Sequence, residues 1–397
     1  MGEIRALGPH ICVDWECIWD IDIFCTLAQN YFIKKDELRQ FERITSEREL
    51  LISILDLMSQ GAGGEVFPAD SAIVEYFARK FQFKTTLGGT AARAAILLAK
   101  LGKSSVLQMC TDNSTIRELL PKEIHGVCAN ENCANRIYPH ASITYPKNAH
   151  IMVNDIDFVT SRENRVLFSM DPDSDQMYID ENFGKYLTDA KVFLQGSFGE
   201  VLDEEILKDR VAKTAKFLAD MPEDGIVLFE DGGYHTHEKR VYVHEQLREY
   251  LDIVSMNEDE LQQYVGHKIN LQNPGQVLLT LKQVYDSVKV PTLFVHSSLW
   301  AVAYGENAQR YRKVLEGGVA AAGSRFWFGD DVGLEEYEKT KALKPQENGR
   351  LFAEAIEKLT DNICCVPCKD LSFVERPTVV GLGDTFAGGL VMELAEL

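Results

Sequence analysis

Short apolar runs alternate with longer amphipathic stretches through the second half of the chain. In the longer stretches apolar residues recur every three or four positions, which predicts helices, whereas the short runs predict buried strands. From residue 190 onward we expect strands at 192–195, 225–229, 253–255 and 291–296, a hairpin partner at 299–304, and helices at 203–220, 239–249, 259–265 and 274–287. This regular alternation predicts an α/β fold with a mostly parallel sheet and helices on both of its faces.

The first half of the chain is less regular. Its patterns predict strands at 6–13, 15–24 and 104–110, and helices at 34–59, 71–81 and 90–101. Residues 130–167 contain only short β-prone pieces, which predicts a small separate sheet that forms a lid. We therefore expect one folded unit over 1–397, with a discontinuous β-rich lid from about 15–80 and 130–180 and a large α/β domain from the remainder.

Composition narrows the class of partner. The 397 residues are 45% hydrophobic and 26% charged, and the formal net charge is −20. Nucleic acid and anionic membranes attract clustered Lys and Arg, so this acidity argues against both as general partners. The first ten residues lack the apolar core of a signal peptide, and no apolar run reaches the roughly eighteen residues of a membrane span. We expect a cytoplasmic protein that binds small molecules, and its oligomeric state stays open.

The nine Cys residues are scattered along the chain. Cys365 and Cys368 have the spacing of a metal-binding pair, but no second pair of Cys or His completes a zinc site in the sequence around them. We therefore expect reduced and mostly buried thiols.

The most informative motif lies near the C-terminus. An extended apolar run, 373–380, meets a glycine turn, and a helix is expected over 385–397. Gly381 and Gly383 can adopt positive φ, and the unpaired N–H groups of a helix start suit a phosphoryl group. Asp384 lies where its carboxylate can accept a proton from a substrate hydroxyl. The alternative is an ordinary helix N-cap, a position at which Asp is common.

Several polar residues follow expected strand ends. Because ligands of parallel sheets bind at the carboxyl edge of the strands, these residues are expected to line one rim. They are Gly196, Glu230, Asn257, His296 and Gly381.

Two of these positions bear on a metal ion. Glu230 could hold a water of a hydrated Mg²⁺, or it could be a turn or cap acid. Asn257 and Glu260 are three residues apart, so one helical turn places them on the same face, and the same spacing is also the capping-box signature. Elsewhere, Arg162 and Arg165 can bind phosphate oxygens, although their spacing alone favours a solvated loop.

Taken together, the motifs resemble those of the ADP-dependent sugar kinases, the glucokinases and phosphofructokinases of the ribokinase superfamily. Residues 88–92 are similar to the family's Gly-Gly helix start beside the sugar, and 161–168 to a lid strand. Residues 257–260 resemble the N-x-x-E metal motif, and 381–385 match the G-x-G-D anion hole and base. The resemblance covers most of the chain and implies a ribokinase-like fold with a small lid.

The resemblance also implies a reaction, the in-line transfer of the β-phosphoryl group of ADP to a sugar hydroxyl, which leaves AMP. Asp384 would be the general base, and the N–H groups of Gly381, Leu382 and Gly383 would neutralise the phosphoryl charge. Mg²⁺ would be held by Glu230, Asn257 and Glu260. The implied sugar contacts are Asp14, Glu16, Glu65, Gly88, Gly89, Thr90, Arg162 and Arg165, and the implied nucleotide contacts are Gly196, His296, Val366 and Gly381.

The chain departs from the family pattern at two motifs. The H-x-E motif appears as Leu228-Phe229-Glu230, without the His, and the N-x-D sugar contact is assigned to Asp14-Trp15-Glu16, with both positions changed. Residues 61–65 resemble a family loop in which an acid favours glucose over fructose 6-phosphate, and Glu65 occupies the position of that acid. The sugar therefore stays open. An ATP-dependent ribokinase-like sugar or nucleoside kinase and a catalytically weak sugar- or nucleotide-binding regulator are the alternatives.

Overall fold

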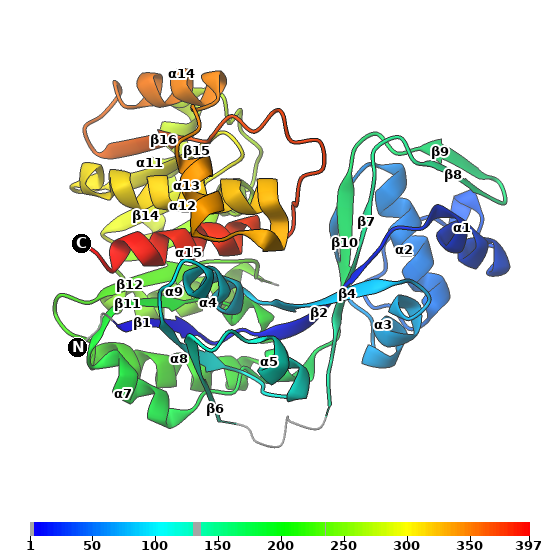
Figure 1. Ribbon diagram of the computed structural model, residues 1–397, viewed down its shortest axis with the longest axis horizontal. Helices are drawn as coiled ribbons and strands as arrows, with labels where there is room; N and C mark the ends of the chain where they lie inside the picture. The colour runs from blue at the N-terminus through cyan, green and yellow to red at the C-terminus, as the bar shows by residue number, and fades with distance from the viewer. Residues whose placement is uncertain (1–3, 130–135, 235) are drawn as a thin grey trace.

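The larger of two main sheets organises the fold (Figure 1). The structure is a computed structural model, and it describes residues 4–129, 136–234 and 236–397. The large sheet has nine strands in the spatial order β16-β15-β14-β13-β12-β11-β1-β5-β6. Its strands are β1 (Ile4–Gly8), β5 (Ser105–Met109), β6 (Ile124–Cys128), β11 (Ala190–Gln195), β12 (Ile226–Glu230), β13 (Ile253–Asn257), β14 (Thr292–His296), β15 (Trp300–Gly305) and β16 (Ile363–Pro367). Within the described residues only β15 runs against its neighbours in this sheet, as its expected hairpin pairing requires.

Helices cover both faces of the large sheet because its strands are apolar on both sides. Leu194 and Leu228 belong to one core and their chain neighbours Phe193 and Phe229 to the other, as the two-residue period of a strand dictates. The first core is covered by α4 (Thr90–Lys100), α12 (Arg312–Phe328) and α15 (Leu382–Leu394). The second is covered by α7 (Gly184–Leu187), α8 (Glu204–Ala219), α9 (His237–Leu247), α10 (Glu258–Val265), α11 (Pro274–Val288) and α14 (Glu347–Ile356).

A second, smaller sheet forms a separate lobe on the right of Figure 1. Its strand order is β3-β10-β7-β2-β4, and a two-stranded ribbon lies beside it. The strands are β2 (Cys12–Cys17), β3 (Gly64–Val66), β4 (Phe83–Gly88), β7 (His140–Tyr145) and β10 (Asn164–Phe168), with β8 (His150–Val153) and β9 (Ile156–Val159) in the ribbon. Helices α1 (Ile21–Asn30), α2 (Glu47–Ser59) and α3 (Ser71–Ala78) complete the lobe. The expected small lid sheet is therefore present.

The remaining helices are short. They are α5 (Ser114–Leu119), α6 (Pro172–Gln176) and α13 (Leu334–Lys341). Within the described residues, no helix combines the length and the apolar character needed to cross a membrane.

Three local predictions in the first half were wrong. Residues 6–13 are not one strand, because β1 ends at Gly8 and β2 begins only at Cys12. Residues 15–24 are not one strand, because β2 ends at Cys17 and the Asp20 carboxylate caps α1 by accepting the N–H groups of Asp22 and Ile23. Residues 34–59 are not one helix, because α2 begins only after its own N-cap, Ser46.

The run at 373–380 was also predicted incorrectly as an extended lead-in to the glycine turn. It forms no strand, because its backbone bonds to the end of α12 instead: Thr378 N donates to Phe326 O, and Arg325 Nε donates to Val380 O. Gly381 therefore follows a loop rather than a strand end. Its position at the rim comes from helix packing, since α15 lies between α4 and α12.

Candidate active site

The first turn of α15 is built around a glycine. Gly381 has φ 69° and is the N-cap of the helix, and its carbonyl accepts from both the backbone N–H and the hydroxyl of Thr385. A Cβ at Gly381 would lie 2.8 Å from Arg93 Cδ, so both the backbone angle and the neighbouring side chain require glycine. The free N–H groups of the first turn are thereby presented beside Asp384.

Asp384 is fixed by helix α4. The hydroxyl of Thr90 donates to Asp384 Oδ1 at 2.8 Å, and Arg93 Nε lies 3.7 Å from Asp384 Oδ2. Arg93 also donates from Nη2 to Asp14 Oδ2 at 2.6 Å, so one buried guanidinium joins the two acids. Burial alone would lower the pKa of Arg93, but the carboxylates of Asp14 and Asp384 raise it above its ordinary value, and the group stays charged.

Sequence reasoning missed Arg93. Its signal was present, however, because it is the sole charged residue among the first ten of the Ala-rich segment 90–101. Arg93 lies one helical turn after Gly89, the N-cap of α4. Its side chain is therefore on the same side of the helix as the glycine turn.

An acidic cavity of about 230 Å³ lies beside Asp384, between the two sheets. Residues predicted from the sequence that line it are Asp14, Glu65, Gly89, Thr90, Arg165, Glu230, Gly381 and Asp384. The lining residues that were not anticipated include His10, Cys12 and His140. Glu65 lies on an exposed strand, but partial desolvation by the cavity walls and the charge of nearby Glu200 raise the pKa of its carboxyl above the ordinary value.

Three predicted sugar contacts lie outside this cavity lining. Glu16 accepts a hydrogen bond from the hydroxyl of Thr86, and Arg162 donates from Nε to the carbonyl of Gly61. Gly88 lies behind the cavity wall, where a Cβ would come within 2.5 Å of the Asp14 carboxylate.

Strand β2 brings only part of the segment Asp14-Trp15-Glu16 to the cavity. Alternate residues of β2 share a face, and on that face the cavity takes Cys12 and Asp14 but not Glu16. Leu228, where the family His is absent, is fully buried in the core of the large sheet and lines neither cavity described for this site.

A larger cleft of about 640 Å³ opens on the other side of the α15 start. Its walls include Asn257, His296, Leu382 and Gly383 from the predicted set. Its apolar part is formed by Val319, Ala322, Phe326, Leu371 and Phe386. Val366 is not in this wall, because it is buried in β16 opposite Ala301, and the segment just after it, 368–372, lines the cleft instead. Gly196 permits close packing of the β11 end against Glu230, whose carbonyl would be 3.0 Å from a Cβ there.

Two acids lie close to each other at the rim: Glu230, in the lining of the acidic cavity, and Glu260, in the first turn of α10. Glu230 Oε2 is buried and has no hydrogen-bond partner among the described residues. Burial and the charge of Glu230 raise the pKa of Glu260 to about 7. His296 Nε2 lies 3.8 Å from Glu230 Oε1, and although burial lowers the pKa of His296, the neighbouring carboxylates raise it overall. An orphaned carboxylate oxygen beside a second acid fits a hydrated Mg²⁺.

Asn257 is the N-cap residue of α10. Its Oδ1 accepts the N–H groups of Asp259 and Glu260, both at 2.9 Å, and Glu260 Oε2 accepts the N–H of Asn257 at 2.8 Å. This capping box orients the Glu260 carboxylate, so the cap and a metal role are compatible for Glu260.

The chain matches the family model described as the ADP-specific phosphofructokinase/glucokinase conserved region over residues 7–302, well over half of its length. The protein belongs to this family. It is therefore an ADP-dependent sugar kinase family member, a phosphotransferase, as the motifs had predicted. Among curated proteins, no sequence matches the chain.

Solved structures of ADP-dependent kinases share the fold. A phosphofructokinase from Pyrococcus horikoshii OT3 with AMP aligns with a TM-score of 0.77 at 15% identity, covering 99% of this chain and 98% of that one. An ADP-dependent kinase in complex with fructose-6-phosphate and ADPβS gives 0.74 at 16% identity, covering 99% and 94%. The last common ancestor of ADP-dependent phosphofructokinases from Methanosarcinales gives 0.73 at 17% identity, covering 100% and 94%. The family member described here thus has the predicted ribokinase-like fold.

Proposed function

We propose that this protein transfers the β-phosphoryl group of ADP to a hydroxyl of an uncharged hexose of the glucose type, giving AMP. The observation that carries the proposal is the position of the α15 start. Gly381 and Asp384 line the acidic cavity, whereas Leu382 and Gly383 line the larger cleft. A phosphoryl group that passes from a nucleotide in the cleft to a sugar in the cavity would meet the N–H groups of this turn.

Within this proposal Asp384 removes the proton from the attacking hydroxyl. The N–H groups of Gly381, Leu382 and Gly383 neutralise the charge on the transferred group, a contribution that dominates phosphoryl transfer. Thr90 and Arg93 are positioning residues for Asp384, because their contacts fix its carboxylate.

The acids Glu230 and Glu260 are proposed to hold Mg²⁺ through water. The ion would supply positive charge to the diphosphate oxygens when bound. In the chain itself, the Asn257 capping box fixes the Glu260 carboxylate, and the orphaned Glu230 oxygen is available to accept from a metal-bound water.

The choice of an uncharged sugar rests on the charges of the cavity. Asp14, Glu65 and Glu200 offer acceptors for hydroxyl groups. Arg93 is already paired with Asp14 and Asp384, and Arg165 is the second arginine of the described lining. Net negative charge disfavours a sugar phosphate, so glucose is proposed ahead of fructose 6-phosphate.

The test is AMP release measured with ADP and Mg²⁺ across glucose, fructose 6-phosphate and other hexoses, with ATP as a parallel donor. We expect AMP with ADP and glucose. Turnover with ATP but not ADP would replace the proposal with an ATP-dependent kinase. Turnover on fructose 6-phosphate alone would retain the reaction and overturn the sugar. Calorimetric binding of sugar and ADP without any AMP would identify a binding regulator.

A further inference from the structure

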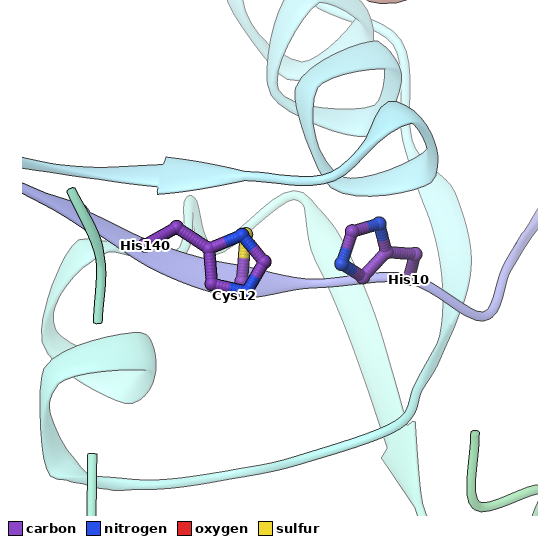
Figure 2. Close-up of side chains that lie close together, drawn as sticks. All are labelled: His10, Cys12 and His140. Carbon is purple, nitrogen blue, oxygen red and sulfur yellow. The ribbon is translucent and has the colours of Figure 1, made fainter. Parts of the chain in front are cut away.

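Three side chains that no step of phosphoryl transfer uses meet at the wall of the acidic cavity (Figure 2). His10 precedes β2, Cys12 begins it, and His140 begins β7, which pairs with β2. One ligand atom from each residue lies within 4.8 Å of the other two. Figure 2 shows the Cys12 sulfur beside the His140 ring, with the His10 ring near both. The ring centroids of the two His residues are 5.9 Å apart.

The ring nitrogens have the hydrogen-bond pattern of metal ligands. His140 Nε2 lies 3.1 Å from Asp171 Oδ2, which leaves Nδ1 as its second nitrogen. The Asp171 carboxylate is itself fixed, because it accepts from the hydroxyl of Ser174 and the N–H of Asp173. A carboxylate that orients a His in this way is typical of the outer shell of zinc sites. His10 Nε2 is buried and has no hydrogen-bond partner among the described residues.

We propose that His10, Cys12 and His140 form a binding site for a Zn²⁺-class ion, whose fourth position faces the acidic cavity. Two imidazoles and a thiolate are ligands that zinc prefers over magnesium, and an open fourth position accepts water or another oxygen. Metal–ligand bonds of about 2.0–2.3 Å place tetrahedral ligands roughly 3.3–3.8 Å apart, so ligand atoms within 4.8 Å of one another need to close in by at most about 1–1.5 Å. On binding, the Cys12 thiol releases its proton to solvent and its sulfur bonds to the metal.

A metal ion at this site would affect sugar binding in the kinase reaction, an inference that rests on the proposed function. Asp14 Oδ1 lies 3.4 Å from Cys12 Sγ, so an ion held by Cys12 would sit against the acids proposed to bind sugar hydroxyls. Zinc would therefore compete with the sugar.

The binding test uses Co²⁺ as a spectroscopic substitute for zinc, with the full-length protein stripped of metal and kept in saturating Mg²⁺ so that oxygen sites are filled. We expect one equivalent of Co²⁺ to give thiolate-to-metal charge-transfer absorption and tetrahedral visible bands, both displaced by Zn²⁺. Cys12→Ser should lose the charge-transfer band. Cys17→Ser, on the same strand but the opposite face, should keep it. A band retained in Cys12→Ser, or absent from the native protein, would overturn the site.

Circular dichroism would show whether Cys12→Ser is folded. If it is not, two further variants test the site. His10→Ala should weaken Co²⁺ binding at least tenfold, and Asp171→Asn should weaken it by roughly 10- to 100-fold through the loss of His140 orientation. Unchanged affinity in both would overturn the proposal. Zinc should inhibit the native kinase in competition with the sugar, and this inhibition should be absent in Cys12→Ser. That result would show that the metal site affects the kinase reaction. Because the absorption readout needs no turnover, an inactive kinase and an absent metal site give different results.

Discussion

The acidic cavity and the larger cleft, which lie on either side of the α15 start, are lined by different kinds of side chain. The acidic cavity is lined by charged groups that hold one another, with Arg93 between Asp14 and Asp384. The larger cleft is shaped by apolar side chains such as Val319 and Phe326. Substitutions of the paired charges in the cavity leave charges unpaired and should have large effects, whereas substitutions in the apolar wall of the cleft change only its shape. The comparison teaches that binding in the cavity depends on electrostatic balance and binding in the cleft on packing.

The largest effect is expected for Asp384→Asn. An amide cannot remove the hydroxyl proton, so kcat should fall by roughly 10²–10⁴-fold while the affinity for ADP changes little. Steady-state AMP release and ADP calorimetry measure the two quantities. Glu396→Gln, beyond the other end of α15, is the matched control and should retain the native rate. Near-native kcat in Asp384→Asn would remove the base assignment.

The second-largest effect is expected for Arg93→Met. It keeps the side-chain volume but leaves Asp14 and Asp384 as uncompensated charges, which should cost about 3 kcal/mol of the free energy of unfolding and most of the activity. Urea denaturation and AMP release measure these. Arg93→Lys should recover part of the stability but less of the rate, because an ammonium cannot span both acids as the planar guanidinium does. Equal stability of native protein and Arg93→Met would show that the acids do not need this cation.

A smaller loss is expected for Gly381→Ala. The new Cβ would be strained at φ 69° and would press on Arg93, so we expect a loss of roughly 1–3 kcal/mol together with reduced kcat. Gly102→Ala is the control, since Gly102 also has positive φ but a Cβ there meets nothing within 4 Å. It should lose stability with no change in kcat. If both variants keep native kcat, close contact at Gly381 has no part in the reaction.

The proposed magnesium ligand Glu260 predicts that the stability of the protein depends on pH. The folded-state pKa of Glu260, about 7, is raised above its ordinary value of 4.5, so the metal-free protein loses stability as pH rises between these values. Mg²⁺ should therefore raise the melting temperature more at pH 8 than at pH 6. Glu260→Gln should stabilise the metal-free protein at pH 8 and remove most of this Mg²⁺ effect. An equal Mg²⁺ shift at both pH values would contradict a role for Glu260.

The sequence predicted the repetitive parts of this molecule well. The strand–helix alternation after residue 190 identified the large sheet, because each element there buries one regular apolar pattern. It could not reveal that 373–380 bonds to the end of α12, or that Arg93 joins two acids from distant segments. The grouping of His10, Cys12 and His140 was equally hidden, because it depends on the pairing of β2 with β7. Local pattern predicts elements, whereas contacts between lobes depend on how the lobes meet.

The smallest expected effect concerns the cleft. Val319→Ala removes two methyl groups from its apolar wall, which should raise KM for ADP by up to about tenfold and leave kcat and the sugar KM unchanged. Val314→Ala is the matched control, since Val314 lies on the same helix and is fully buried but does not line the cleft. It should lower stability without changing KM for ADP. A change in kcat or in the sugar KM from Val319→Ala would mean that the cleft and the cavity are not separate in their energetics, because packing on one side would then alter the charge balance on the other.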